Sequence, residues 1–385
     1  MSRKLQAGFV PLIDAAPLIA AKEKDFAAAE GIALRLIRQS SWASLRDHLN
    51  LGHIDCAQAL APLPIAAALG VGQVRANLVV PLVLSRGGNA ITLSTALTDE
   101  IRAANGNVNP QGARAWARAL AIAIRQRREP VTLAMVYPFS GHNFEIRYWL
   151  AAAGIHPDRD VRLVPIPPAL MVESLRAQQI DGFCVGAPWN SIAVNQGIGE
   201  IVAAKSEIFP HGIEKVLAVP EALLEDRATS YALIRALANA AAWCDQPDNY
   251  RELAELLARE DYLGTDPAVN LKALEGSVPN ANNELKPDYL YFSRHDANRP
   301  RRIDALWIYA QMLRWGQIPP SAEAETVAAE VFRPDVYGRA IGDDSVDADA
   351  VIEACDRVSF DGLSVSAHLQ MFDLATPYGC PYSEL

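Results

Sequence analysis

Short apolar runs alternate with amphipathic segments along the first sixty residues of the chain. The apolar runs have the length of buried strands, and the amphipathic segments have the spacing of helices. Ser40 or Ser41 can cap the second helix, and Gly52 can end it. The pattern predicts strands over residues 5–10, 32–37 and 54–60, and helices over residues 14–26 and 41–49.

The same alternation returns after a loop rich in Asn and Gly at residues 105–112. Strands that alternate with helices are typical of parallel, doubly wound sheets. Because the pattern occurs in two blocks, we expect an α/β protein with two similar lobes. The second block predicts strands over residues 131–136, 161–165 and 182–185, and helices over residues 140–153 and 171–178.

Two strand-like runs, 79–84 and 90–93, flank a Gly-Gly turn and suggest a crossing between the lobes or the rim of a pocket. Residues 216–219 have the pattern of a strand that returns. The later sequence is helical over 221–257 and 304–315 and loop-like over 279–300 and 359–385. We therefore expect residues 1–92 to begin lobe I, residues 93–214 to form lobe II, and residues 215–385 to return to lobe I and wrap it.

The composition limits the classes of function. The 385 residues include 35 Lys and Arg against 45 Asp and Glu, which gives a net charge of −10. Such an acidic chain is not attracted to phosphates in general, so we expect no direct contact with nucleic acid. The five cysteines are scattered and form no CxxC motif, which favours reducing surroundings over a disulfide framework.

The N-terminal segment begins with a positive cluster, but no apolar run of signal-peptide length precedes Pro11. No window contains the roughly 18 to 20 uninterrupted apolar residues of a membrane span. These patterns predict a cytoplasmic chain that makes no contact with the membrane.

Enzyme signatures are missing from the sequence. It contains no P-loop, no HExxH and no GxSxG motif, and Gly70 begins only a fragment of a dinucleotide fingerprint. The seven histidines are dispersed, and His48 and His53 are five residues apart instead of the four that two zinc ligands on a helix need. We therefore predict no catalytic residues, no cofactor and no metal site.

A few residues stand at predicted strand ends and turns, where open α/β sheets bind ligands. Trp42 opens a helix and either donates to a ligand or packs in the core. The Gly88-Asn89 turn either presents N–H groups to an anion or only reverses the chain. His142 begins a helix, where it either donates to an anion or belongs to a capping loop. Lys215 precedes the returning strand and is either a ligand or solvated.

Five motifs, in this order along the chain, resemble the nitrate/bicarbonate solute-binding proteins. They are FVPLIDAAPL (9–18), SWASLRD (41–47), GNAITLS (88–94), HNFEIRYWL (142–150) and IDGFCVGAPWN (180–190). The resemblance covers residues 5–219 and extends more loosely through the C-terminal helices. It implies a periplasmic-binding-protein-like fold of type II, with two lobes, a doubly wound and mainly parallel sheet in each, and a ligand cleft between them.

The resemblance also implies a set of contacts to nitrate or nitrite. Nitrate has three acceptor oxygens, no donor and one negative charge, so it needs several donors and a compensating cation. The implied contacts are Trp42, Gly88, Asn89, His142 and Lys215, with Lys215 as the cation. If His142 donates while neutral, the affinity should change little between pH 7 and 8.

The sequence departs from the family pattern at two positions. Nitrate binders of this family usually have Gln where Asn89 stands, so this contact is water-bridged or differently placed. Bicarbonate binders have an acid that holds calcium where this chain has Ala187, which favours nitrate or nitrite over calcium-assisted bicarbonate.

The cytoplasmic nitrate sensors of the NasS type resemble the transporter subunits but control an RNA-binding antiterminator, NasT. Together with the N-terminal sequence, this resemblance predicts a cytoplasmic nitrate/nitrite sensor that releases a NasT-like partner when the anion binds. One alternative is a nitrate-binding subunit of an ABC transporter. Another is a THI5/NMT1-like biosynthetic enzyme, but the scattered cysteines offer no counterpart of the Cys-rich motif of those enzymes.

Overall fold

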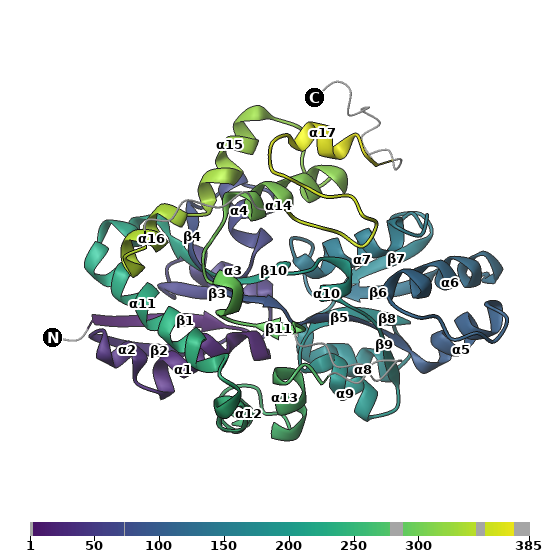
Figure 1. Cartoon of the computed structure of the whole chain (residues 1–385), viewed down its shortest axis with the longest axis horizontal. Helices are drawn as coiled ribbons and strands as arrows, with labels where there is room; N and C mark the ends of the chain where they lie inside the picture. Colours follow the sequence, from purple (N-terminus) through teal and green to yellow (C-terminus); the bar gives the residue numbers. More distant parts are fainter. Residues whose placement is uncertain (1–2, 73, 278–287, 344–350, 373–385) are drawn as a thin grey trace.

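Two β-sheets lie side by side and form two lobes, and the later helices pack above and below them in the view of Figure 1. The computed structural model describes residues 3–72, 74–277, 288–343 and 351–372. Within these residues no helix is long and apolar enough to cross a membrane. The two-lobed α/β architecture predicted from the alternating pattern is confirmed.

The first sheet, on the left in Figure 1, belongs to lobe I. Its strands are β1 (Arg3–Phe9), β2 (Ile32–Arg38), β3 (Cys56–Leu60), β4 (Leu78–Gly87), β10 (Ile213–Pro220) and β11 (Leu290–Tyr291). They lie in the order β11-β4-β10-β3-β1-β2. β1 is parallel to β2 and β3, whereas β10 is antiparallel to β3 and β4.

Successive residues of these strands face opposite apolar layers, as the pleat of a strand requires. On β3, Cys56 belongs to one buried cluster and Ala57 to the other. Ser41 caps α3 as predicted, since its hydroxyl accepts from the N–H of Ser44 at 3.1 Å. The helices of this part are η1 (Ile13–Ala15), α1 (Ala16–Glu23), α2 (Phe26–Ala29), α3 (Trp42–Asn50) and α4 (Pro62–Leu69).

The second sheet, on the right in Figure 1, has the order β7-β6-β8-β5-β9 and belongs to lobe II. Its strands are β5 (Asn89–Ser94), β6 (Val131–Met135), β7 (Val161–Pro165), β8 (Gly182–Gly186) and β9 (Gly199–Ala204). Its helices are α5 (Thr95–Ala104), α6 (Ala113–Gln126), α7 (Gly141–Ala151), η2 (Pro168–Leu170), α8 (Met171–Arg176), α9 (Trp189–Asn195) and α10 (Lys205–Ile208). β6 is parallel to β7 and β8, and β5 is antiparallel to β8 and β9.

Both sheets are therefore mixed, and the parallel pairing is confined to β2-β1-β3 and β7-β6-β8. The strand with which the chain enters lobe II is β5, and the strand with which it returns to lobe I is β10. Each lies antiparallel beside the three parallel strands of its sheet. The sequence pattern gave no direction for these two strands, because a run of apolar residues is the same in either direction.

The first crossing between the lobes lies earlier than predicted. We expected lobe I to continue to residue 92, but β5 already pairs within the second sheet from Asn89 onward. The crossing is therefore at Gly88, because a chain that leaves one sheet at Gly87 enters the other two residues later. The second crossing precedes β10, which begins at Ile213, close to the predicted boundary at 214 and 215.

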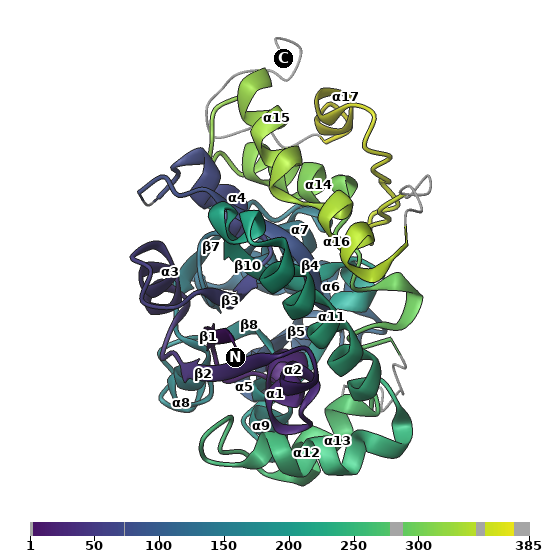
Figure 2. The ribbon, with the colours of Figure 1, turned by 90° about the vertical axis from the view of Figure 1, so that its left-hand side faces the viewer.

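The C-terminal part is mainly helical and packs on both lobes (Figure 2). α11 packs on α1 and α2, and α15 packs on α4. The loops predicted over 279–300 and 359–385 contain short elements, namely β11, η5 and α17, while residues 278–287 and 373–385 lie outside the described part. The helices are η3 (Glu221–Glu225), α11 (Arg227–Cys244), η4 (Pro247–Asn249), α12 (Tyr250–Ala258), α13 (Pro267–Leu274), η5 (Arg294–Asp296), α14 (Arg302–Arg314), α15 (Ala322–Val331), α16 (Pro334–Ile341) and α17 (Val365–Leu369).

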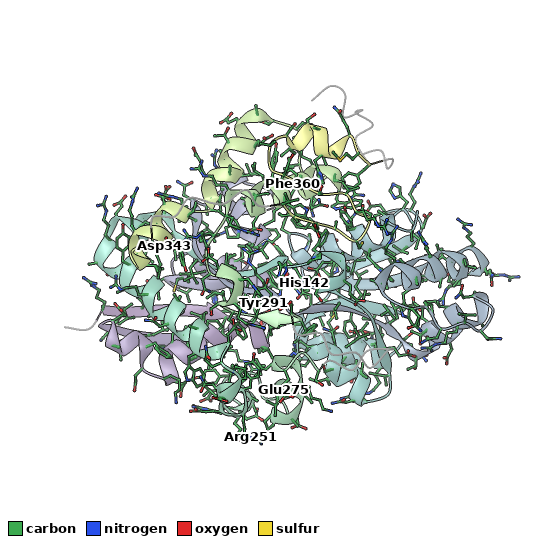
Figure 3. All side chains as sticks on the ribbon, viewed as in Figure 1. His142, Arg251, Glu275, Tyr291, Asp343 and Phe360 are labelled. Atoms are coloured by element: carbon green, nitrogen blue, oxygen red, sulfur yellow. The ribbon has the colours of Figure 1, made fainter. Side chains whose placement is uncertain are left out.

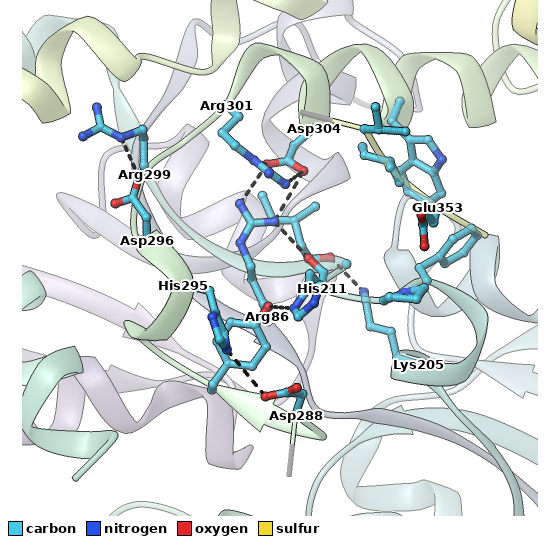
Figure 4. A pocket seen from close by; sticks show the side chains of 18 residues that line it. Arg86, Lys205, His211, Asp288, His295, Asp296, Arg299, Arg301, Asp304 and Glu353 are labelled. Carbon is cyan, nitrogen blue, oxygen red and sulfur yellow. Dashed lines mark hydrogen bonds and ion pairs between the residues drawn. The ribbon is translucent and has the colours of Figure 1, made fainter. Parts of the chain in front are cut away.

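A buried ion pair joins this C-terminal part to lobe I. Arg86, near the end of β4, contacts Asp304 of α14, with Nη2 and Oδ2 2.8 Å apart and both side chains almost fully buried. Burial would raise the pKa of Asp304, but the guanidinium groups of Arg86 and Arg301 lower it to about 2. The pair lies in the wall of a cavity of about 720 Å³ between β4, β10 and the C-terminal segment (Figure 4).

Candidate functional site

Polar side chains from both lobes meet where the parallel strands end. η1 follows β1, α3 follows β2 and α7 follows β6, so the N-termini of these segments face the junction between the lobes. This is the position at which open α/β sheets bind ligands. His142 marks the place near the middle of Figure 3.

Lys215 on β10 is the centre of the lobe I half of this cluster. Its Nζ lies 2.8 Å from Asp14 Oδ2 and 2.7 Å from Glu214 Oε1, and 5.3 Å from the centre of the Trp42 ring. Burial would lower the pKa of Lys215, but the two carboxylates hold it above its ordinary value. The amide of Gln58 on β3 donates to Asp14, so this carboxylate is held from two sides.

A second lysine, Lys205, connects the two lobes. Its Nζ lies 2.7 Å from Glu145 Oε1 on α7 and 2.5 Å from Glu214 Oε2 on β10, and it donates to the carbonyl of Ile213. All three charged side chains are buried. Since Glu214 accepts from both lysines, one continuous network runs from Asp14 in lobe I to Glu145 in lobe II.

His142 lies at the start of α7, which Ser140 caps. The ring is fully buried, and its Nδ1 is 3.5 Å from Glu214 Oε1. Burial lowers the pKa of His142 to about 3, because the nearby carboxylate does not offset the lost hydration of the imidazolium. The imidazole is therefore neutral at physiological pH, and its contact with Glu214 is not an ion pair.

Several buried polar atoms of this cluster have no hydrogen-bond partner among the residues that the structure describes. They are Trp42 Nε1, Asn89 Oδ1, and both Nδ1 and Nε2 of His142. Buried polar groups are nearly always hydrogen-bonded, so an orphaned group indicates a place for water or a ligand. The indole and the imidazole can each donate an N–H, which suits a ligand rich in acceptors.

The Gly-Gly turn does not present its N–H groups to the site. The N–H of Gly88 donates to the carbonyl of Tyr289, and the N–H of Gly87 donates to the carbonyl of Gly212. At Gly87, φ is +73° and a Cβ atom would lie 2.2 Å from the oxygen of Tyr289, so glycine is required for backbone approach. The anion-binding interpretation of this turn is therefore wrong, because the C-terminal segment already uses its donor.

Asn89 is part of the network, but its amide has an unexpected partner. Its Nδ2 donates to both carboxylate oxygens of Glu145, at 3.0 and 3.1 Å. The structure thus brings together Trp42, Asn89, His142 and Lys215, whereas Gly88 contributes only the crossing beside them. Whether these residues bind a ligand stays a prediction.

Five further polar residues of the cluster were not predicted from the sequence. Glu214 is adjacent to Lys215 in sequence, and Asp14 and Glu145 occur within the motifs that carry the resemblance, so these motifs contained a signal for them. Gln58 and Lys205 carried no signal, because only the folded chain brings their side chains to Asp14 and Glu145. The missed residues are Asp14, Gln58, Glu145, Lys205 and Glu214.

The carboxyl groups differ in how well they are compensated. Burial would raise the pKa of Glu214, but Lys205 and Lys215 hold it well below its ordinary value. For Glu145 and Asp14, burial dominates and raises the pKa of each, against the opposing effect of one lysine. Glu214 is therefore the permanent negative charge of the cluster.

Gly141 makes room for this network, and replacing it by alanine should disturb the site. A Cβ atom there would lie 2.6 Å from Glu214 Oε2 and 3.2 Å from Lys205 Nζ. We expect Gly141→Ala to lower the free energy of unfolding by about 1–3 kcal/mol, as overpacking of a buried site does. Thermal or urea unfolding would measure this. A Gly141→Ala protein as stable as the unmodified protein would contradict the steric explanation.

The topology and the polar cluster between the lobes define a two-lobed solute-binding protein of type II. The chain belongs to the NMT1-like family, whose model matches residues 1–258. The resemblance to nitrate/bicarbonate solute-binding proteins is confirmed by its relatives and by a solved structure.

The relatives include both nitrate and bicarbonate proteins. The chain is 30% identical over 385 residues to the nitrate/nitrite binding protein NrtA of Synechococcus elongatus. The matched region covers 94% of this chain and 84% of that protein. It is 38% identical over 340 residues to the bicarbonate transport ATP-binding protein CmpC of Synechocystis, covering 87% of this chain and 49% of that protein. It thus spans about half the length of several curated relatives it matches. The crystal structure of the periplasmic nitrate-binding protein NrtA from Synechocystis superposes with a TM-score of 0.89 and 27% identity, covering 97% of this chain and 99% of that one.

Proposed function

We propose that this protein binds nitrate or nitrite between its two lobes. The observation that carries the proposal is the buried network in which Lys215, with Trp42 and His142 beside it, offers a cation and unpartnered N–H donors. An anion that only accepts hydrogen bonds complements such donors. The NrtA relatives, which are named for nitrate and nitrite, support this choice of anion.

The choice of nitrate over bicarbonate is supported by Ala187. Ala187 offers no carboxylate that could hold calcium beside the ligand. A neutral His142 can donate one N–H to an anion without adding a charge.

Nitrate should change the fluorescence of Trp42. Its indole is 1% exposed and lies beside Lys215, so an anion at Lys215 alters the field at the ring. We expect nitrate titration to change the intrinsic emission of the protein. We expect Trp42→Phe to lose most of this change, although six other tryptophans remain.

The control is Trp243→Phe, on α11 and remote from the site. It should retain the response at the same nitrate concentration. A full response in the Trp42→Phe variant would place the anion elsewhere, and no response in the unmodified protein at millimolar nitrate would contradict anion binding.

We further propose that the protein is a cytoplasmic sensor that controls a NasT-like RNA-binding antiterminator. The five motifs resemble the nitrate/bicarbonate solute-binding proteins, a family that includes the NasS-type sensors, and this supports the role. The CmpC relative is named for bicarbonate transport, so this match supports the transporter alternative and not the sensor.

The coupling would be a shift between open and closed lobes. Nitrate contacts both lobes only when they are closed, so it stabilises that state by its differential affinity. A partner that prefers the open state is released, and by reciprocity it weakens nitrate binding. The acidic chain, with its net charge of −10, also suits a partner with a basic RNA-binding surface.

A pull-down from cytosol with and without nitrate tests the role. We expect a small RNA-binding protein to co-purify without nitrate and to be lost when nitrate is added. The Lys215→Met variant should retain it under both conditions. Co-purification of ABC-transporter subunits instead would favour the alternative, a nitrate-binding subunit of a transporter.

A further inference from the structure

Asn89 is oriented in a way that does not suit an anion. Its Nδ2 donates to both oxygens of Glu145, and its Oδ1 is buried without a partner among the described residues. A carbonyl oxygen repels an anion, because both carry negative charge and neither has a hydrogen to share. For Asn89 to donate to nitrate, its amide must turn over.

The turn requires a change at Glu145. If the amide turned while Glu145 stayed ionised, its carbonyl oxygen would face a carboxylate at about 3 Å, as close as the amide nitrogen is now. With a proton on Glu145, the new O–H can donate to Asn89 Oδ1, and both hydrogens of Nδ2 become free. The two orientations of the amide therefore correspond to two protonation states of Glu145.

The charge of the cluster favours the same change. The carboxylates of Asp14, Glu145 and Glu214 face the ammonium groups of Lys205 and Lys215, which leaves one net negative charge while His142 is neutral. A bound nitrate would make this two negative charges in a buried site, which is costly without compensation. Uptake of one proton restores the original charge.

We propose that the site takes up nitrate together with one proton, that the proton goes to Glu145, and that the Asn89 amide turns over to donate to the anion. This rests on the proposed nitrate binding. The proton comes from solvent and forms an O–H bond on the Glu145 carboxyl. The two hydrogen bonds from Asn89 Nδ2 to Glu145 are replaced by one from Glu145 O–H to Asn89 Oδ1.

Glu145 is a better acceptor for this proton than the other groups. It faces Lys205 from α10, Glu214 from β10, Asn89 from β5 and the thiol of Cys184 from β8, at 3.3 Å. Burial raises its pKa, and Glu214 raises it further, against the opposing effect of Lys205. By contrast, burial lowers the pKa of His142 to about 3.

Asp14 has no amide partner that can turn to accept a hydrogen bond from the protonated acid. Its amide partner Gln58 cannot turn over, because Gln58 Oε1 already accepts from the N–H of Val10 at 2.9 Å. A proton on Asp14 would therefore point at the donor group of Gln58. The two carboxyl groups therefore differ in their amide partners, since Asn89 can turn over beside Glu145 whereas Gln58 is fixed beside Asp14.

Calorimetric titration of the full chain with potassium nitrate between pH 6 and 9 tests the proposal. It is done in two buffers with different enthalpies of ionisation, neither of them an oxyanion. We expect the heat to depend on the buffer, with uptake approaching one proton per nitrate. The affinity should fall toward roughly tenfold per pH unit at the alkaline end. Buffer-independent heats with a flat affinity would overturn the proposal, and no nitrate heat at any pH would overturn the proposed function instead.

Glu145→Gln imitates the protonated state and identifies the acceptor. This variant should bind nitrate with little dependence on pH and without proton uptake, and more tightly than the unmodified protein at pH 9. Asp14→Asn, the matched control, should still take up a proton. If uptake disappears in Asp14→Asn and persists in Glu145→Gln, Glu145 is not the acceptor and the proposal fails.

Discussion

Lys215→Met should weaken nitrate binding by at least about 100-fold. Lys215 holds the cationic end of the proposed site, where it is fully buried and contacts Asp14, Glu214 and the face of Trp42. Removing one member of a buried charge network costs about 3–5 kcal/mol, because the remaining charges lose their compensation. In this variant Asp14 and Glu214 also repel the anion. Both the affinity for nitrate and the free energy of unfolding should therefore decrease. Calorimetric titration measures the affinity, and thermal unfolding measures the stability.

Two companion variants separate these effects. Lys272→Met removes an exposed lysine of α13 and should leave nitrate affinity unchanged. Lys215→Arg keeps the charge and should fold, but its planar head group changes the geometry and should retain only part of the affinity. Unchanged affinity in a well-folded Lys215→Met protein would contradict the assignment of the site.

Arg86→Met should give the second large effect, on stability and not on the anion. It leaves Asp304 buried, with Arg301 as its remaining cationic partner among the described residues. We expect the free energy of unfolding to fall by about 3–5 kcal/mol. The pKa of Asp304 is about 2 in the fold against an ordinary 3.8, so the folded state favours the ionised form. The contribution of ionised Asp304 to the free energy of unfolding is complete above pH 3.8 and is lost as the pH falls through about 2.

A double variant shows whether the unpaired charge causes the loss. Arg86→Met with Asp304→Leu replaces both charges by apolar groups of similar size, which is often neutral or stabilising. We expect it to be more stable than Arg86→Met alone in urea unfolding. If the double variant loses as much as both single variants added together, the loss comes from packing instead of charge.

The regular elements of the fold were predictable where the pattern was strong. β7 occupies the predicted residues 161–165, and β2 the predicted 32–37 plus one residue, because apolar runs bounded by turns set these limits locally. Several elements were missed, among them β9, α5 and α6. α4 was missed because it is apolar all round and has no polar face to give it a period. The direction of β5 and β10 depends on contacts with distant strands, which no local pattern contains.

Site residues were predictable from the sequence where residue type and position within an element indicated a role. They were not predictable where the role depends on a contact with a residue that is distant in sequence. Trp42, His142 and Lys215 were conspicuous by type and position. Lys205 was not, because its role arises from Glu145 and Glu214, which lie 60 residues before it and nine after it in sequence. The donor role expected of Gly88 failed for the same reason, since its N–H is used by Tyr289, 201 residues further along the chain.

That bond between Gly88 and Tyr289 has a mechanical consequence. Tyr289 holds the crossing at two points, since its carbonyl accepts from Gly88 N–H and its hydroxyl donates to Gly88 O at 3.0 Å. The chain continues from Tyr289 into β11, which pairs with β4 and leads on to η5 and the rim of the neighbouring cavity. A rotation about Gly88 therefore pulls on this clamp as well as on the lobes. A change in the angle between the lobes at Gly88 is thereby transmitted to the outer surface of the C-terminal segment. A second protein that contacts this surface would distinguish the open from the closed lobes without entering the cleft.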